Sequence, residues 1–382
     1  MTGQRTLNLL NNCIYIKMQN NKPSILLICN TPFQILMACH IAALYYKGYD
    51  VDITISEGIK DGETLAQNAQ KATMFRNVLY IKNKKTFLSS SSILGKCRYV
   101  FGRIWEVWNN WKIAKNLSKN RYDVCLFSNI SIFTKLFTSL LHKHNPNAKL
   151  AIFEEGLVTY TKLYASGDAP TSLYRRFIDR EGLLARINVL YLCHPHLLEW
   201  ELPNGTIVTL PPINKNSTKL ITDLNTIFDY NQCEDVYDKR ILFFEESHIF
   251  EGFDVPDIDI VNQIANVVGK DEMMIKIHPR NPENRFSNLG YKTNKNTSIP
   301  WELILLNQSF EDKVLVTISS GAVVSPYLYL GIPCISYSLL NCLSKRPGFM
   351  QSDLGDLMQR VYKEYDEILK APSNIEQFLT QL

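Results

Sequence analysis

Two adjacent carboxylates, Glu154 and Glu155, follow the apolar run AIF and stand directly before Gly156. If this run is a buried strand, the two charges repel one another, and lost solvation raises the pKa of at least one carboxyl group. A carboxylate tuned in this way can act as a general base toward a hydroxyl group. Because neighbouring strand residues point to opposite faces, one of the two should lie in the site, and we favour Glu155. The alternative is a charged turn without chemistry.

A second apolar run, MMIKI, ends on His278, Pro279 and Arg280. Pro279 biases His278 toward an extended backbone, which would present the imidazole at the tip of a strand. A histidine there can protonate a leaving phosphate or donate a hydrogen bond to it, and Lys276 and Arg280 would add positive charge. The competing interpretation is a structural histidine.

Two further strand or helix ends carry polar groups. Glu302 follows Pro300 where a helix should begin, so its carboxylate could accept from ribose hydroxyls or simply stabilise the helix dipole. Ser319, Ser320 and Gly321 lie between an apolar strand and a helix. Hydroxyls, backbone amides and a helix N-terminus would converge there, as in phosphate sites, although an ordinary serine cap is the alternative.

Regular alternation of strand and helix patterns surrounds these residues and predicts an α/β fold with two doubly wound, Rossmann-like domains facing a cleft. This is the GT-B arrangement, although fold does not fix function. Strands are predicted at 23–30, 50–56, 77–83, 123–129, 148–156, 240–247, 273–278, 313–319 and 332–338, and helices at 31–48, 132–144, 257–269, 321–331 and 356–371. We expect an N-terminal extension at 1–22, an N-terminal domain at 23–210, a linker at 211–239 and a C-terminal domain at 240–382.

The composition narrows the class of protein. A length of 382 residues predicts two domains, and 46% apolar with 20% charged residues is typical of a folded protein. There is no apolar run of about 18 residues and no signal peptide, so we expect a cytoplasmic protein. Nine cysteines without a CxxC indicate reduced thiols. Asp-x-Asp patterns at 50–52 and 257–259 start a predicted strand and helix, so we expect no metal site.

One segment, 82–121, is strongly basic, with ten Lys or Arg residues against the single acid Glu106. Within it, Trp105, Trp108 and Trp111 recur every three residues, as on one stripe of a helix. The stripe could face the core, or it could dock on an anionic membrane surface. No recognition motif accompanies the charge, so nucleic acid is not an expected partner.

The motifs, taken in order, resemble those of the bacterial sialyltransferases. That group shares a (D/E)-(D/E)-G motif, an HP motif, a Pro-x-Glu element and a serine pair. The matching residues are Glu154-Glu155-Gly156, His278-Pro279, Pro300-Trp301-Glu302 and Ser319-Ser320. The stretch CNTPFQ at 29–34 is similar to the first strand–helix turn of glycosyltransferase family 52, the lipooligosaccharide sialyltransferases. The resemblance covers roughly residues 23–340.

The resemblance implies an inverting, metal-independent transfer of sialic acid from CMP-sialic acid to a galactoside-type hydroxyl of a bacterial surface glycan, a lipooligosaccharide or a capsule. It implies a carboxylate base and no cofactor beyond the donor substrate. It also implies that His278 assists CMP departure and that the serine pair holds the phosphate while Glu302 binds the ribose. The remaining donor-side residues are Lys276, Pro279, Arg280 and Gly321, and the acceptor side holds Asn30, Thr31 and Gln34.

Several alternatives stay open at this point. A second acidic cluster, Glu245, Glu246, Asp254 and Asp257, follows the run RILFF, and Asp254 is the other candidate for the base. The second His-Pro, His194-Pro195, is not accompanied by a comparable series of motifs, so we interpret it as structural. The function could also be hexose transfer from another nucleotide sugar, sugar-nucleotide epimerisation, or non-catalytic glycan or membrane binding. The partners expected are the donor, an oligosaccharide acceptor and the inner face of the membrane, and a homodimer is one alternative for the oligomeric state.

Overall fold

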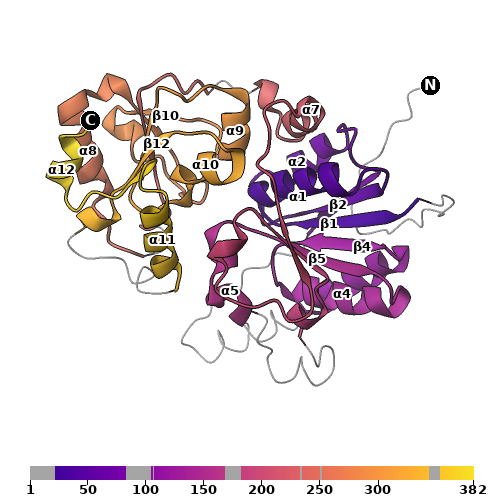
Figure 1. Ribbon diagram of the computed structural model, residues 1–382. Coiled ribbons are helices and arrows are strands. Elements are labelled where there is room, and N and C mark those ends of the chain that lie inside the picture. Colours follow the sequence, from indigo (N-terminus) through magenta and orange to yellow (C-terminus); the bar gives the residue numbers. More distant parts are fainter. Residues whose placement is uncertain are drawn as a thin grey trace, which may run out of the picture.

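The computed structural model describes residues 22–82, 105, 107–167, 182–232, 235–249, 252–343 and 353–382 (Figure 1). The expected N-terminal extension, apart from Lys22, lies outside the described residues, as do 83–104 and 106 of the basic segment. Two parallel sheets form the framework, one in each half of the chain.

The N-terminal sheet has seven parallel strands in the order β3-β2-β1-β4-β5-β6-β7. They are β1 (Ser24–Cys29), β2 (Asp50–Ser56), β3 (Asn77–Ile81), β4 (Val124–Phe127), β5 (Lys149–Phe153), β6 (Val189–Leu192) and β7 (Thr206–Thr209). The strand order reverses between β1 and β4, which pair through Ile25 and Val124. Every residue of β1 is buried, as expected for a parallel strand covered on both faces.

The helices of this half are α1 (Pro32–Tyr45), α2 (Gly62–Ala69), a helical run at 107–117, α4 (Ile132–His144) and α5 (Lys162–Ser166). The start of α1 follows from its sequence: Thr31 caps the helix by accepting from Gln34 N, and Pro32 occupies the first helical position. This cap fixes the turn between β1 and α1, at the carboxyl end of the central strand.

The C-terminal sheet has the order β10-β9-β8-β11-β12-β13, again all parallel. Its strands are β8 (Ile241–Phe244), β9 (Met273–Lys276), β10 (Lys292–Thr293), β11 (Val314–Thr317), β12 (Ile335–Ser338) and β13 (Leu369–Lys370). Its helices are α8 (Asp257–Val268), α9 (Trp301–Asn307), α10 (Ser325–Leu330), α11 (Asp353–Glu364) and α12 (Ile375–Leu379). This is the six-strand Rossmann order, with its reversal between β8 and β11. The predicted fold of two doubly wound α/β domains is confirmed.

Between the sheets, α7 (Thr218–Ile227) lies in the segment expected to connect the domains. It packs on α1 and α2 and also touches α9 (Figure 1). Asp223 of α7 accepts hydrogen bonds from Thr73 N at 2.7 Å and from the Thr73 hydroxyl. Asn225 and Asn307 exchange two amide hydrogen bonds of 2.9 Å. The connection is therefore bonded to both domains.

The described part of the basic segment contradicts one expectation. In the helical run at 107–117, Trp108 is 55% exposed and Trp111 40% exposed. The buried face instead carries Ile113, Ala114 and Leu117. The interpretation of the tryptophans as a core-facing stripe is wrong for these two, because the spacing of Ile113, Ala114 and Leu117 selects a different face of the same helix. Within the described residues, no helix has the length and apolar character needed to cross a bilayer.

Candidate active site

Several of the residues singled out in the sequence lie at the end of a strand or within two residues of it. Asn30 follows β1, Glu154 follows β5, and Ser319 lies just beyond β11. Lys276 is the last residue of β9, and His278 lies two residues later. All strands in each sheet are parallel, so these groups gather at the carboxyl edges, where open α/β sheets bind ligands.

Glu154 is fully buried behind the end of β5. Its Oε2 accepts from Cys193 N at 2.8 Å and from the Tyr160 hydroxyl. Its Oε1 has no hydrogen-bond partner within the described part of the chain. Burial raises the pKa of Glu154 to about 7, although the bonds from Tyr160 and Cys193 act in the opposite direction.

Glu155 is partly exposed and lies beside the turn between β1 and α1. Burial raises the pKa of Glu155, and the neighbouring Gln34 side chain lowers it in part. Gln34 is fully buried, and its Oε1 accepts from Asn30 N at 2.7 Å. Gln34 Nε2 makes no hydrogen bond to the described residues, although it is close enough to influence Glu155. Two groups predicted separately, one for the base and one for the acceptor side, are thus neighbours.

Gly156 turns the chain away after the two carboxylates. Its backbone lies at φ +94° and ψ −165°, a region that only glycine adopts readily. A Cβ at this position would lie 3.9 Å from the Tyr329 hydroxyl of α10, so the other domain approaches here. The Tyr329 hydroxyl is influenced by Glu154 on the N-terminal side and by Glu302 on the C-terminal side. Burial, reinforced by these carboxylates, raises the pKa of Tyr329.

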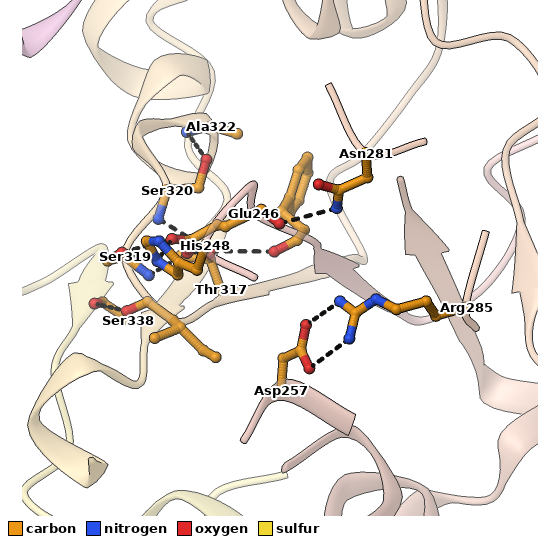
Figure 2. A network of polar contacts seen from close by, with 12 residues as sticks. Glu246, His248, Asp257, Asn281, Arg285, Thr317, Ser319, Ser320, Ala322 and Ser338 are labelled. Carbon is orange, nitrogen blue, oxygen red and sulfur yellow. Dashed lines mark hydrogen bonds and ion pairs between the residues drawn. The ribbon is translucent and has the colours of Figure 1, made fainter. Parts of the chain in front are cut away.

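The serine turn after β11 is held by a carboxylate from the neighbouring strand. Glu246 Oε1 accepts from the Thr317 hydroxyl at 2.8 Å and from Ser319 N, and its Oε2 accepts from the Ser319 hydroxyl at 2.6 Å (Figure 2). The His248 ring contacts the same carboxylate and lies 3.0 Å from Ser319 Oγ. Burial by itself raises the pKa of Glu246, but His248 and the bonds from Ser319 outweigh it and lower the pKa below the ordinary value.

This arrangement gives the two serines different positions. The amide and hydroxyl of Ser319 are both engaged with Glu246. Ser320 lies one residue further out, where its Oγ accepts from Ala322 N at 3.2 Å and caps the turn. Gly321 is exposed, and a Cβ there would meet nothing within 4 Å. Ser320 and Gly321 are therefore the part of the turn that an incoming anion could reach.

The backbone around His278 is anchored by Glu245. Glu245 Oε2 accepts from His278 N at 3.1 Å, and Glu245 Oε1 pairs with Arg285 at 2.9 Å. Arg285 also pairs with Asp257 at 2.5 Å (Figure 2). His278 Nδ1 accepts from Arg280 N at 3.2 Å, which fixes the ring relative to the turn that follows. Pro279 and Arg280 themselves are exposed.

Lys276 and Glu302 are brought together although they are distant in the sequence. Both are largely buried, and the positive charge of Lys276 acts on the Glu302 carboxyl group. Burial raises the pKa of Glu302, and the Ser325 hydroxyl and Lys276 lower it in part. Pro300 precedes the helix with an extended backbone, so Glu302 lies in the first turn of α9.

Asp254, the other candidate for the base, differs in its surroundings from the two Asp-x-Asp patterns. Asp254 is exposed on the loop before α8. Asp50 and Asp52 both pair with Arg76, at 3.0 and 2.8 Å, and Asp257 is paired with Arg285. Among the residues described, no group of three or more His, Cys, Asp or Glu side chains is placed to hold a metal ion.

Sequence reasoning missed several members of this site. Tyr329 and Arg285 carried no signal, because the carboxylates near them come from distant parts of the chain. Tyr160 was missed although Glu154 lies only six residues before it. Glu246 was noticed only as one acid in a cluster. A signal for His248 did exist: residues two apart on an extended chain share a face, so Glu246 and His248 could have been paired.

A family model for alpha-2,8-polysialyltransferases (POLYST) matches residues 25–338, a range that includes both sheets except for the edge strand β13. The chain belongs to this family. The match supports the bacterial sialyltransferase type expected from the motifs, and it names the polysialyltransferase family rather than glycosyltransferase family 52. No curated protein was found to match this chain.

Solved structures agree on the fold. The glycotransferase of kitacinnamycin superposes with a TM-score of 0.51 at 10% identity, over 93% of this chain and 87% of that one. UGT89C1 of Arabidopsis thaliana, complexed with UDP, superposes with a TM-score of 0.50 at 11% identity, over 94% of this chain and 89% of that one. The UDP-GlcNAc 2-epimerase of Methanocaldococcus jannaschii superposes with a TM-score of 0.48 at 13% identity, over 94% of this chain and 92% of that one. At these identities the first two likenesses show a GT-B fold and nothing about substrates. With the family match, they identify the protein as a glycosyltransferase of the GT-B fold.

Proposed function

We propose that this member of the polysialyltransferase family transfers sialic acid from CMP-sialic acid to a glycan hydroxyl, with inversion and without a metal ion. The observation that carries the proposal is the junction at Tyr329. There the acidic end of β5 meets α10, which follows the serine turn, and Glu302, which is coupled to Lys276. Base-type and donor-type groups from different domains thus share one region.

In the proposed reaction, Glu155 removes the proton from the acceptor hydroxyl, whose oxygen then bonds to the anomeric carbon of the sialyl group. We favour Glu155 over Glu154 because it is partly exposed and adjoins Gln34, whereas Glu154 is fully buried. Asp254, by contrast, is exposed on the loop before α8. A raised pKa brings the base closer to the working pH.

On the donor side, the bond between the anomeric carbon and the phosphate oxygen breaks, and CMP leaves with the bonding electrons. His278 donates a proton or hydrogen bond to the departing phosphate. Ser320 and the backbone amide of Gly321 would hold that phosphate, with Ser319 fixed behind them by Glu246. Lys276, Pro279 and Arg280 complete the donor side, with Glu302 directed at the ribose.

The proposal includes two classes of acceptor glycan. A galactoside-type hydroxyl of a lipooligosaccharide or capsule is one class. The family name adds a second class, a glycan that already ends in sialic acid. Both classes present a hydroxyl that a carboxylate could deprotonate, so the comparison of the two belongs in the assay.

We further propose that the exposed tryptophan face of the 107–117 helix docks on the anionic inner surface of the cell membrane. Lys112 Nζ lies 5.6 Å from the ring centre of Trp108, and Lys115 Nζ lies 4.8 Å from that of Trp111. Exposed tryptophans flanked by lysines are typical of helices that lie in the headgroup region of a membrane.

The assay incubates the protein with CMP-sialic acid, EDTA, and either a galactoside or a sialic-acid-terminated oligosaccharide, and reads the product mass and linkage. We expect a sialylated product, and a loss of about 10²-fold or more for Glu155→Gln and for His278→Ala. Glu311→Gln, an exposed carboxylate on the loop between α9 and β11, is the control and should stay active. Turnover of a UDP-sugar alone would contradict the proposal, and donor conversion without acceptor would indicate an epimerase.

A further inference from the structure

His194, in the second His-Pro of the chain, contacts the opposite domain. Its Nε2 lies 3.0 Å from the Leu328 carbonyl oxygen in α10, and its Nδ1 lies 3.2 Å from the Tyr365 hydroxyl just beyond α11. A carbonyl can only accept, so Nε2 carries the proton and Nδ1 accepts from Tyr365. Burial lowers the pKa of His194, which favours this neutral form.

The backbone of the same residue reaches the acidic end of β5. His194 N donates to the Tyr160 hydroxyl at 3.1 Å, and that hydroxyl donates to Glu154. Cys193 N, the preceding amide, donates directly to the same carboxylate oxygen at 2.8 Å. The segment that touches the C-terminal domain is therefore also the segment that holds Glu154.

Further contacts keep this segment between the two domains. Glu199 N donates to the Tyr160 carbonyl at 2.8 Å, and the Glu199 carboxylate pairs with Arg360 of α11 at 2.5 Å. His196 Nε2 lies 2.6 Å from Glu364 Oε1. These last two pairs are substantially exposed, so each adds little by itself. The two less exposed contacts of the His194 ring carry the connection.

We propose that His194 is a positioning residue, which ties the Glu154-Glu155-Gly156 turn to the domain carrying the serine turn and so fixes the proposed base relative to the donor. The proposal rests on the proposed function for the identity of the base, but the physical coupling between the domains does not. Removing the ring should leave the donor-binding groups intact and misplace the base. Small misplacements of reacting groups cost up to about 10²-fold in rate.

The test compares His194→Ala, His194→Gln and His142→Ala. His142 is a matched control, because its Nε2 also lies 3.0 Å from a backbone carbonyl oxygen, that of Ala148, within its own domain. For His194→Ala we expect kcat to fall by about 10²-fold with little change in the donor KM. Glutamine can place an amide N–H near the position of Nε2, so it should restore part of kcat. His142→Ala should keep the wild-type kcat.

A second readout needs no turnover. In His194→Ala, backbone amide hydrogen exchange should rise both at residues 154–161 of the N-terminal domain and at 326–330 of α10, and in His142→Ala at neither. Unchanged exchange at 154–161 would overturn the proposal whatever happens to kcat. If wild-type protein fails to use CMP-sialic acid, the proposed function fails while the exchange result still decides the coupling. Should His194→Ala not fold, Tyr365→Phe removes one of the two ring contacts from the opposite side and must raise exchange at 154–161.

Discussion

At the scale of single residues, Glu154 combines full burial with an uneven set of hydrogen bonds. Both of its donors, Tyr160 and Cys193 N, reach Oε2, while Oε1 has no partner in the described part of the protein. Burial without further donors favours the neutral, protonated form of this carboxyl group, and it raises the pKa of Glu154 to about 7.

The raised pKa of Glu154 makes stability depend on pH. Below the ordinary pKa of 4.5 the group is neutral in both states, and as pH rises toward 7 the unfolded chain ionises first, so stability is lost. The full penalty above about pH 7 is about 3 kcal/mol. Glu154→Gln has no such penalty, so its unfolding free energy relative to wild type should increase by about 3 kcal/mol between about pH 4 and about pH 8.

Denaturant unfolding at both pH values would measure this difference. Glutamine keeps an oxygen for Tyr160 and Cys193 N, so the substitution preserves the packing. Glu283→Gln, at an exposed position, serves as the reference for effects of charge alone. A constant difference between Glu154→Gln and wild type would mean that Glu154 does not hold its proton in the folded state.

At the scale of elements, the sequence predicted the central strands well, because β1, β4, β8 and β9 are buried throughout and mainly apolar. It missed β6, a mostly buried strand inside the N-terminal sheet, and three edge strands, which are β7, whose residues are mostly exposed, and the two-residue strands β10 and β13. Such edges form only because a neighbouring strand offers hydrogen bonds, and a local pattern does not contain that information.

The site shows the same division between local and distant information. Strand-end positions such as Glu154 and Ser319 could be located from the pattern, because an apolar run ends there. The pairing of Glu155 with Gln34, and of Glu246 with Ser319, depends on which strands are adjacent in space. Strand order cannot be obtained from local sequence patterns, and it follows only once a fold has been assigned to the sequence.

The turn after β5 gives a prediction at this scale. Gly156→Ala should destabilise the protein by about 1–3 kcal/mol, since a Cβ is strained at φ +94° even though its nearest contact, 3.9 Å away, is an ordinary one. Gly321→Ala is the matched control, because a Cβ there meets nothing within 4 Å and no positive φ is required. Thermal or denaturant unfolding of the two variants compares them, and equal effects would exclude backbone strain as the cause.

At the scale of the whole molecule, charge and exposed aromatic surface are concentrated on one domain. The segment 82–121 has ten basic residues against one acid, an excess larger than the net charge of +4 of the whole chain. Val107, Trp108 and Trp111 in its described part are exposed. A protein docked through this helix would meet the membrane with its N-terminal domain, the side on which we place the acceptor.

Membrane docking can be measured directly. Trp108→Ala with Trp111→Ala should reduce co-sedimentation with vesicles rich in anionic lipid by about tenfold or more, through lost interfacial burial. Turnover of a soluble acceptor should be unchanged. Val267→Ala, at an exposed apolar position of α8, is the control and should bind as wild type does. Equal binding of the tryptophan variant and wild type would contradict docking through this face.

The helix α7 has a practical consequence for anyone who wishes to produce the two halves as separate polypeptides. A cut near residue 211 would remove the helix that covers α1 and α2, and would leave Thr73 without Asp223. A cut after Phe228 keeps those contacts. It gives up the hydrogen bonds that the segment before it makes to the C-terminal domain, which are the Asn225–Asn307 exchange, Ile213 N to the Tyr329 carbonyl and Lys215 Nζ to the Gln308 carbonyl. The better place to divide the chain is therefore after α7, where the donor-side half would start close to its first strand.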